Sequence, residues 1–516
     1  MPQRRWGLLV TLAGTLTVLS ACARPIETMD CWRKLPEPDP RSRADYVAWA
    51  QACGQRGVTD NAWGAYARLM ASFPEPEAKE QLYVGYAVRW PWEEERFAAA
   101  AAWLDRAAAS FELLREASQH EHLYAPLMPD GPYLLHVTSE KRNPIRKAVR
   151  GLAAAGWREF YRGDPKPLRQ DALVMLRVAH HLDEAVTPTG RLGTGGFARS
   201  LYRDVLLQLL DRCEDPGAVA AELLEALCEA DPPPPSLVRT VTMQYAALAD
   251  MYQRVYRWDD AAGRYVMDRG EIDSVRSEFR RLRKLSDQEI TEQLLPSDYE
   301  ASIAFLKAHH EKLLEYVDQP YADIREVMDR LDGAVDRKGT YLTQTTVRKL
   351  RRFLIERNQV VAARRATHLI YALWTHRHAR GTFPPSLDEL DVTDLAELRR
   401  DAFSPRDFAY RLTAEGFTLY SLGIDMVDQG GRHAEDWGFE DGGDYVFWPM
   451  QPITPPWLRP RILITSDGRI LEQPRDGGPV RELSPEEIGL TSQEEEESEP
   501  AQPTRKRAPS GETEEN

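Results

Sequence analysis

The sequence of 516 residues has little cysteine and lacks the short motifs that most often mark an enzyme. It has five cysteines, no HExxH zinc motif, no GxSxG nucleophile elbow and no Lys-Ser or Lys-Thr after its glycine-rich stretch at 193–196. Beyond residue 21 it has no apolar run of the roughly 20 residues that a bilayer span needs. Positive charge is in deficit, since the net charge is −15. This argues against nucleic acid as a partner and against electrostatic attachment to anionic lipid.

Residues that could serve catalysis are present but are not arranged for it. Histidines occur as close pairs on expected helices, where neighbouring side chains point about 100° apart, so core or surface positions are favoured over a shared metal ion. The stretch 193–196 favours a turn. No carboxylate pair stands out among 81 acidic residues. The sequence therefore favours a protein that is not an enzyme. The histidine pairs are His120/His122, His180/His181, His309/His310 and His376/His378.

The N-terminus is built like an export signal. Arg4 and Arg5 precede a mostly apolar run over residues 6–19, and two small residues come just before Cys22. The stretch Leu19-Ser20-Ala21-Cys22 resembles the lipobox of bacterial lipoproteins, in which the cysteine is acylated and becomes the mature N-terminus. The resemblance implies that residues 1–21 are a signal peptide and that Cys22 carries palmitate-type chains. A plain signal peptide and a transmembrane anchor are the alternatives, and an apolar run of about 14 residues is short for the second.

The lipobox also predicts where the protein resides. Ala23, where Asp would signal retention, favours the outer membrane, with the chain facing the periplasm and attached through its acyl chains alone. Disulfides persist in that compartment, and the cysteines close in sequence suggest the pairs Cys31–Cys53 and Cys213–Cys228. Each bridge would contribute roughly 3 kcal/mol by restricting the unfolded chain. Four unpaired thiols are the alternative.

Composition and periodicity predict a mainly α protein with a small C-terminal α+β part. Residues 22–40, rich in proline and charge, read as a tether. Residues 41–340 read as a multi-helix bundle or an irregular solenoid without a fixed repeat. One long helix is expected over 341–380, then two strands within 408–421, all in a module spanning 341–450. A β-hairpin extension follows over 451–488, and 489–516 is a disordered acidic tail. Further helices are expected at 63–73, 96–118, 144–162, 169–184, 197–213, 216–229, 236–256, 298–317 and 321–332.

The segment 362–448 carries a second resemblance. After the long helix come Gly381-Thr-Phe-Pro-Pro-Ser-Leu-Asp-Glu-Leu390, then Gly416-Phe-Thr-Leu-Tyr-Ser-Leu-Gly-Ile-Asp425, and finally Asp441-Gly-Gly-Asp444-Tyr-Val-Phe447. This order resembles the C-terminal domain of the major pseudopilins of type II secretion. The layout of the whole chain is similar to that of uncharacterised bacterial envelope lipoproteins with a larger helical N-terminal part. Because the chain lacks the long apolar helix of a pseudopilin, we expect a shared module and not a shared role.

The pseudopilin resemblance implies a calcium loop. Calcium takes about 6–8 oxygen ligands in a flexible geometry, and a loop rich in Asp and Gly can supply them. The sequence departs from the family at Met426, where Gly is usual, at Asp401-Ala402, where Asp-Pro is usual, and in a longer loop. A solvated acidic turn without an ion is the alternative. The implied ligands are the Leu422 carbonyl, Asp425 and one or more of Asp441 and Asp444, and Asp428 is added by spacing alone.

These features predict a lipid-anchored protein of the cell envelope with a non-enzymatic interaction or scaffold role and with protein partners in the envelope. An accessory component of a type II secretion or pilus-like assembly is the first alternative. An envelope hydrolase with a cleft that the sequence does not reveal is the second.

Overall fold

The computed structural model describes residues 26–55, 60–129, 134, 137–139, 143–184, 194–268, 270–271, 299–338, 341–433, 443–451, 461–464, 470–473 and 481–483. Contacts divide the chain into two compact units, Met1–Gln451 and Pro452–Asn516, and each is considered by itself. The predicted signal peptide, Cys22, Asp441 and the acidic tail at 489–516 lie outside the described residues.

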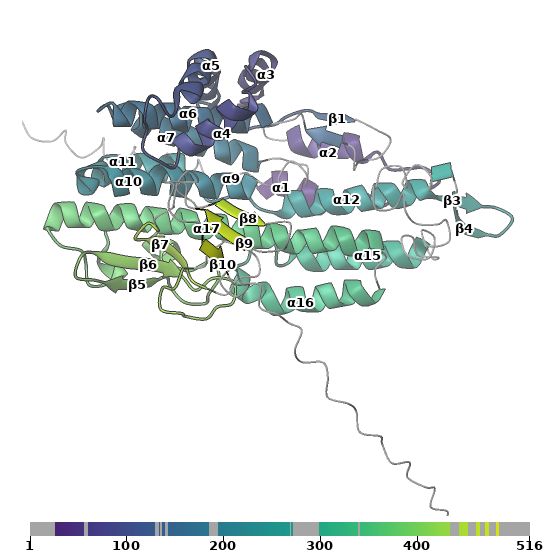
Figure 1. The fold of residues 1–516 in the computed structure, drawn as a ribbon. Helices are drawn as coiled ribbons and strands as arrows, with labels where there is room; N and C mark the ends of the chain where they lie inside the picture. The colour runs from purple at the N-terminus through teal and green to yellow at the C-terminus, as the bar shows by residue number, and fades with distance from the viewer. Residues whose placement is uncertain are drawn as a thin grey trace, which may run out of the picture. The chain divides into compact units, whose positions relative to one another are not determined.

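The first unit is mainly helical, as predicted (Figure 1). Most helices form close to their expected positions, and the long one has the predicted ends. The N-terminal helices are α1 (Ile26–Arg33), α2 (Tyr46–Gln55), α3 (Trp63–Ser72), α4 (Ala78–Ala87), α5 (Ala98–Ala117), α6 (Asn143–Tyr161) and α7 (Lys166–Asp183). They are followed by α9 (Thr194–Leu201), the π-helix η3 (Tyr202–Leu207), α10 (Gln208–Arg212), α11 (Pro216–Ala230), α12 (Val238–Val255), α15 (Tyr299–Leu314), α16 (Tyr321–Lys338), α17 (Tyr341–Arg380), the short 3₁₀-helix η5 (Leu387–Glu389) and α18 (Leu395–Leu398).

The helices pack as a bundle and not as a solenoid. In a solenoid each repeat contacts only its neighbours in sequence. Here α17 packs against α9, η3 and α11, which come much earlier in the chain, and α12 packs against α1 and α2 as well as α15. These long-range contacts are visible as helices lying alongside one another in Figure 1.

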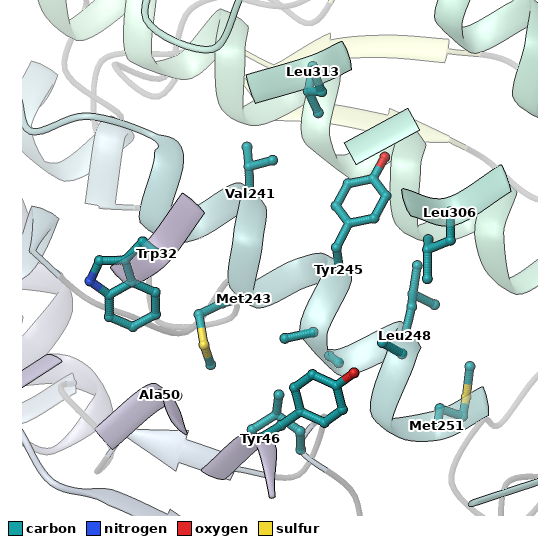
Figure 2. Close-up of a cluster of buried hydrophobic side chains, with 14 of the residues drawn as sticks. Trp32, Tyr46, Ala50, Val241, Met243, Tyr245, Leu248, Met251, Leu306 and Leu313 are labelled. Atoms are coloured by element: carbon teal, nitrogen blue, oxygen red, sulfur yellow. The ribbon is translucent and has the colours of Figure 1, made fainter. Parts of the chain in front are cut away.

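Helix α12 is the centre of one hydrophobic cluster of this bundle. All its residues are buried except Arg239 and Arg254. A helix without an exposed face needs neighbours on every side. Figure 2 shows Trp32 and Tyr46, from α1 and α2, on one side of α12, and Leu306, from α15, on another. The central position of α12 brings the N-terminal segment into the core.

The prediction of a tether over 22–40 was wrong for the described residues of that range. Trp32 of α1 is fully buried, and a disulfide joins Cys31 to Cys53 of α2, with their Cα atoms 5.6 Å apart. The amide side chain of Gln253 accepts from the Ala44 N–H at 2.8 Å and donates to the Ala44 carbonyl at 2.9 Å. Proline and charge around Trp32 suggested an extended linker, but one buried indole and one disulfide fold the segment onto α12.

Helix α17 does not begin a separate domain at 341. It is a central element of the bundle and also carries the small sheet, since it contacts β6 and β7. The sequence suggested a boundary at 340 because the strands that follow α17 differ in pattern from the helices before it. The compact unit instead extends to Gln451.

The sheet on α17 is antiparallel, in the order β5-β6-β7. Its strands are β5 (Ala409–Leu412), β6 (Phe417–Ser421) and β7 (Tyr445–Trp448). β5 and β6 pair in register from Ala409 opposite Tyr420 to Leu412 opposite Phe417. Phe417 stacks on Trp448 with ring centroids 5.9 Å apart, and Trp448 meets Trp374 of α17 edge-on at the same separation. Aromatic packing therefore fixes the sheet on the helix.

The second unit contains the predicted hairpin and one more strand. β8 (Arg461–Ile464) pairs antiparallel with β9 (Ile470–Gln473), and β10 (Arg481–Leu483) adds to the other edge of β9. The turn residues 466–468 lie outside the described residues.

Two further hairpins of the first unit, with strands of three or four residues, were not predicted. They are β1 (Leu127–Pro129) with β2 (Val137–Ser139), and β3 (Tyr256–Asp259) with β4 (Arg264–Met267). Among the helices in the described ranges, none combines the length and the apolar character that crossing a bilayer requires.

Candidate functional site: a groove lined by arginines

A groove of about 580 Å³ opens in the first unit between α4, α6, α9 and η3. Small-molecule sites commonly have volumes of roughly 300–1,000 Å³ and mostly apolar walls with a few placed polar groups. Leu82 at the rim is 50% exposed, which is unusual for a large apolar side chain in this protein. The apolar wall is formed by Leu82, Val88, Phe197, Leu201 and Val205.

One side of the groove is shaped by the π-helix η3. Its Asp204 carbonyl accepts from the Trp157 indole N–H at 3.2 Å, and its Leu206 carbonyl accepts from the Tyr371 hydroxyl at 3.1 Å. Side-chain donors from α6 and α17 thus stabilise the wider turn. π-turns are rare and are frequent at functional sites. Here the turn places Asp204 and Val205 in the wall of the groove.

The Asp204 carboxylate is buried and is neutralised by arginine. Oδ2 lies 3.2 Å from Nε of Arg89, and Oδ1 lies 2.7 Å from Nε of Arg203. A buried carboxylate with two guanidinium partners has more positive than negative charge around it. The pair Arg89–Asp204 also links the segment just after α4 to η3.

A second arginine of the groove has no such partner. Arg150 of α6 lines the groove and is exposed, and within the described ranges it makes no hydrogen bond or ion pair. Arg146 lies one helical turn earlier on the same face. Burial and the nearby charge of Arg150 lower the pKa of Arg146. Like charges so placed repel each other, and an anion beside Arg150 would relieve that repulsion.

Two glycines leave the groove open. Gly196 lies in the first turn of α9, so the predicted turn at 193–196 was wrong for its described residues, which are helical from Thr194. Gly85 of α4 also lines the groove, and a Cβ atom added there would meet nothing within 4 Å. The N-terminal end of α9 adds its partial positive charge near Gly196.

The sequence-predicted acidic loop is held by its own hydrogen bonds. Asp425 accepts from the Val427 N–H at 3.0 Å and from the Gln429 side chain at 2.7 Å. Asp428 accepts from the Tyr420 hydroxyl at 2.9 Å and pairs with Arg411 at 3.2 Å. A cation already neutralises Asp428, so this residue is a poor calcium ligand.

Asp444 is the loop carboxylate that fits an ion best. It is fully buried, and its Oδ2 accepts from the Gly431 N–H at 2.7 Å. Its Oδ1 has no hydrogen-bond partner among the described residues. Burial raises the pKa of this carboxyl. In the part of the chain that the structure describes, no three acidic, histidine or cysteine side chains gather into a metal cluster, and Asp441 lies outside that part.

A neighbouring carboxylate that was noted only as a departure from the family is structural. Asp401 accepts from the Phe403 N–H at 3.0 Å, the Ser421 hydroxyl at 2.7 Å and the Leu422 N–H at 3.1 Å. Burial nevertheless raises its pKa to about 6. Asp401 therefore fixes the peptide at Leu422, the predicted carbonyl ligand, at the end of β6.

The predicted disulfide between Cys213 and Cys228 is not formed, and both are free thiols. Cys213 ends α10, and Cys228 lies in the last turn of α11, which begins at Pro216. Helix α11 rises 1.5 Å per residue, so Cys228 lies about 18 Å along it from Pro216, whereas bridged Cα atoms are about 4.4–6.8 Å apart. Proximity in sequence was misleading here because the segment between them is a helix.

Cys228 instead joins a buried polar network between α11 and α17. Its sulfur lies 3.8 Å from Nδ1 of His368, whose Nε2 lies 2.9 Å from Asp231. Nucleophile, base and orienting carboxylate follow this order in cysteine hydrolases. Burial raises the pKa of Cys228, however, so the thiol stays protonated, and Asp231 also accepts from the Tyr202 hydroxyl at 2.8 Å. The network is best explained as a structural contact that holds α11 and α17 together.

Three histidines of the other predicted pairs are core residues, whereas His378 is exposed. His181 is fully buried, with Nδ1 2.9 Å from the Tyr66 hydroxyl and Nε2 3.0 Å from the His120 carbonyl. His309 and His310 are buried against Tyr245. Burial lowers the pKa of each of the three histidines to about 4. They are neutral packing residues and hold no metal cluster in the described ranges.

No family model, curated protein or solved structure matches this chain. The assignment of the groove as a candidate site therefore depends on its geometry alone. The sequence offered one sign of it, the like-charged pair Arg146 and Arg150 on a single helix face. The residues opposite them come from α4 and α9, and only the fold shows that these helices meet.

Proposed function

We propose that this protein is a lipid-anchored component of the cell envelope that binds other molecules and does not transform them. The observation that carries the proposal is the disulfide between Cys31 and Cys53, which follows closely after Cys22. Structural disulfides persist in oxidising compartments and are rare in the cytosol. The disulfide therefore supports export, and the lipobox resemblance supplies the anchor at Cys22. Ala23 favours the outer membrane, with the folded chain on the periplasmic side.

The groove supports binding as the role of the folded part. It offers an apolar wall and an arginine, Arg150, that has no partner among the described residues. The network of Cys228, His368 and Asp231, which resembles a catalytic arrangement, is by contrast buried between helices. We infer that envelope proteins and small ligands are partners through such surfaces, and that α17 with β5–β7 is a pseudopilin-like module. The antiparallel order β5-β6-β7 on a long helix supports that module assignment. The same arrangement gives less support to an accessory role in a secretion assembly than to the module assignment, because the sheet is fixed to a helical bundle.

Calcium binding at the acidic loop stays a prediction. The buried Asp444, with one oxygen that has no partner in the described part, supports it, and the ion pair between Arg411 and Asp428 opposes it. If calcium binds, Asp425 and Asp444 would hold it together with the Leu422 carbonyl and Asp441. The ion would then stabilise the loop.

Metabolic labelling with a palmitate analogue tests the anchor. The full chain should take up the label and sediment with membranes, and Cys22→Ala should lose both properties. Cys213→Ala is the matched control, because it removes a half-buried cysteine outside the lipobox and should keep the label. Labelling that persists in Cys22→Ala would overturn the proposal.

A further inference from the structure

The arginine-lined groove has two features of a ligand site, an apolar wall and a charged side chain without a partner among the described residues. We propose that it binds an anionic amphiphile, an acyl chain carrying a carboxylate or phosphate head group. The acyl chain would lie along the apolar wall, and Arg150 would bind the head group. This inference does not depend on whether Cys22 is acylated.

The positive charge of the groove selects the head group. In a chain with a net charge of −15, the residues that line the groove include two arginines, Arg89 and Arg150, against one carboxylate, Asp204. Asp204 already has Arg89 and Arg203 as partners. Arg150 is therefore the cation left for an incoming anion, and guanidinium groups bind carboxylates and phosphates through paired hydrogen bonds. The first turn of α9, at Gly196, adds N–H groups of the same polarity.

The apolar wall selects the tail. Leu82, Phe197 and Leu201 come from two different helices and line one continuous groove. Leu82 is half exposed at its rim, and burial of such a side chain against an acyl chain is favourable by about 25 cal/mol per Å² of apolar surface. A groove of about 580 Å³ suits a single chain or a small molecule better than a whole protein helix.

The structure supplies two variants that separate the tail from the head. Gly85→Leu puts an isobutyl group into the groove from a position with no atom within 4 Å of its Cβ. It should not disturb folding, because leucine is a better helix former than glycine. Arg150→Gln removes the charge of the head-group site and keeps most of the side chain's length.

The test uses the full mature chain with Cys22→Ala and dansyl-undecanoic acid as a fluorescent anionic amphiphile. We expect saturable binding that palmitate and palmitoyl lysophosphatidic acid displace, and the stronger competitor identifies the head group. Monopalmitoylglycerol, which has no charge, and butyrate, which has a short tail, should each compete at least about tenfold more weakly, since a charged hydrogen bond or a buried chain is lost.

Arg150→Gln should weaken binding by about tenfold or more, and Gly85→Leu should abolish it. The matched controls are Arg325→Gln, an exposed arginine of α16, and Gly64→Leu, an exposed glycine of α3 with the same free space around its Cβ. Both should bind as the parent chain does. Circular dichroism melting curves verify that every variant is folded. Absence of saturable binding by the parent chain would overturn the proposal. Folded Gly85→Leu and Arg150→Gln variants that bind as tightly as the parent chain would overturn it as well.

Discussion

Nε2 of His368 lies 2.9 Å from Oδ2 of Asp231, and this contact joins the middle of α17 to the residue that ends α11. Both side chains are buried. Helices α11 and α17 are separated in sequence by more than a hundred residues, and they make one of the most extensive helix contacts of the bundle. Substitutions in this pair can therefore test whether a polar network holds the two halves of the first unit together.

Replacing Asp231 with Ala should destabilise the protein strongly. The change leaves His368 and the Tyr202 hydroxyl without their acceptor in a buried place, and such losses cost about 3 kcal/mol. Urea unfolding at pH 7 measures the change. Asp215→Ala at the other end of α11 is the control, because exposed Asp215 caps the helix N-terminus through Ala218 and lies 3.9 Å from His378 at the surface, so its loss should cost about 1 kcal/mol. Equal costs for the two variants would contradict the role of the network.

The stability of the protein should fall when the pH is lowered from 7 to 5, and His181 should account for part of the fall. Burial lowers the pKa of His181 to about 4, and the ordinary value is 6.5. The unfolded chain therefore takes up a proton below about pH 6.5 while the folded chain does not, so acid favours unfolding down to about pH 4. At pH 5 the effect of one such histidine is about 1–2 kcal/mol.

Urea unfolding of wild type and His181→Gln at pH 7 and pH 5 measures this contribution. The variant loses the contact with Tyr66 and is less stable at pH 7, but its further loss on acidification should be smaller by about 1–2 kcal/mol. Gly151→Ala, which changes the core without removing a titrating group, should keep the pH dependence of wild type. If the stability of His181→Gln had the same pH dependence as that of wild type, the assignment of this contribution to His181 would be refuted.

Alanine should have opposite effects at two helical glycines. A Cβ atom at Gly151 would lie 2.6 Å from the Trp103 ring and 3.0 Å from Phe111, two rigid groups of the core. Gly151→Ala should destabilise by about 1–3 kcal/mol despite the better helix propensity of alanine. Gly64 has open space around it, so Gly64→Ala should stabilise by about 0.5–1 kcal/mol. Thermal unfolding of both variants checks the sign, and stabilisation by both would show that α6 can move away from α5.

Calcium should raise the melting temperature of the full chain if the acidic loop binds it. The rise should disappear in Asp425→Ala and in Asp444→Asn, whereas magnesium, which prefers six ligands in a rigid geometry, should have little effect. Without calcium, Asp444→Asn should be neutral or mildly stabilising, because it removes a buried charge with an unpartnered oxygen in the described part. No rise at millimolar calcium would leave the loop as a solvated turn.

Periodicity predicted much of the fold. The apolar positions of the segment 341–380 predicted the long helix, Gly381 and the prolines after it predicted its end, and the sequence Phe417-Thr-Leu-Tyr-Ser421 predicted β6 at its observed position. Local pattern failed where a single distant contact decides the structure. Trp32 lies among prolines and charges, and only its burial against α12 makes the segment part of the core. The pairing of Cys213 with Cys228 failed for the same reason, because helix α11 determines how far apart they lie.

The groove could not be predicted because its parts are unremarkable in isolation. Gly85, Arg150 and Gly196 lie on three helices, and nothing in the sequence near any of them refers to the other two. Charge pairs such as Asp204 with Arg89, which are distant in sequence, have no local signal either. Helix packing creates this kind of site, and it becomes visible only with the fold.

The hydrogen bonds between Ala44 and Gln253 span 209 positions of the chain. During synthesis at about 5–20 residues per second, α12 would follow the N-terminal segment by roughly 10–40 s. The disulfide closes only 22 positions and can form as soon as Cys53 is exposed to oxidant. The earliest part of the chain to be made would thus be cross-linked first and remain without its partner helix until much later. Its buried indole, Trp32, would be exposed throughout that interval, so α1 would reach its folded environment only after α12 has been made.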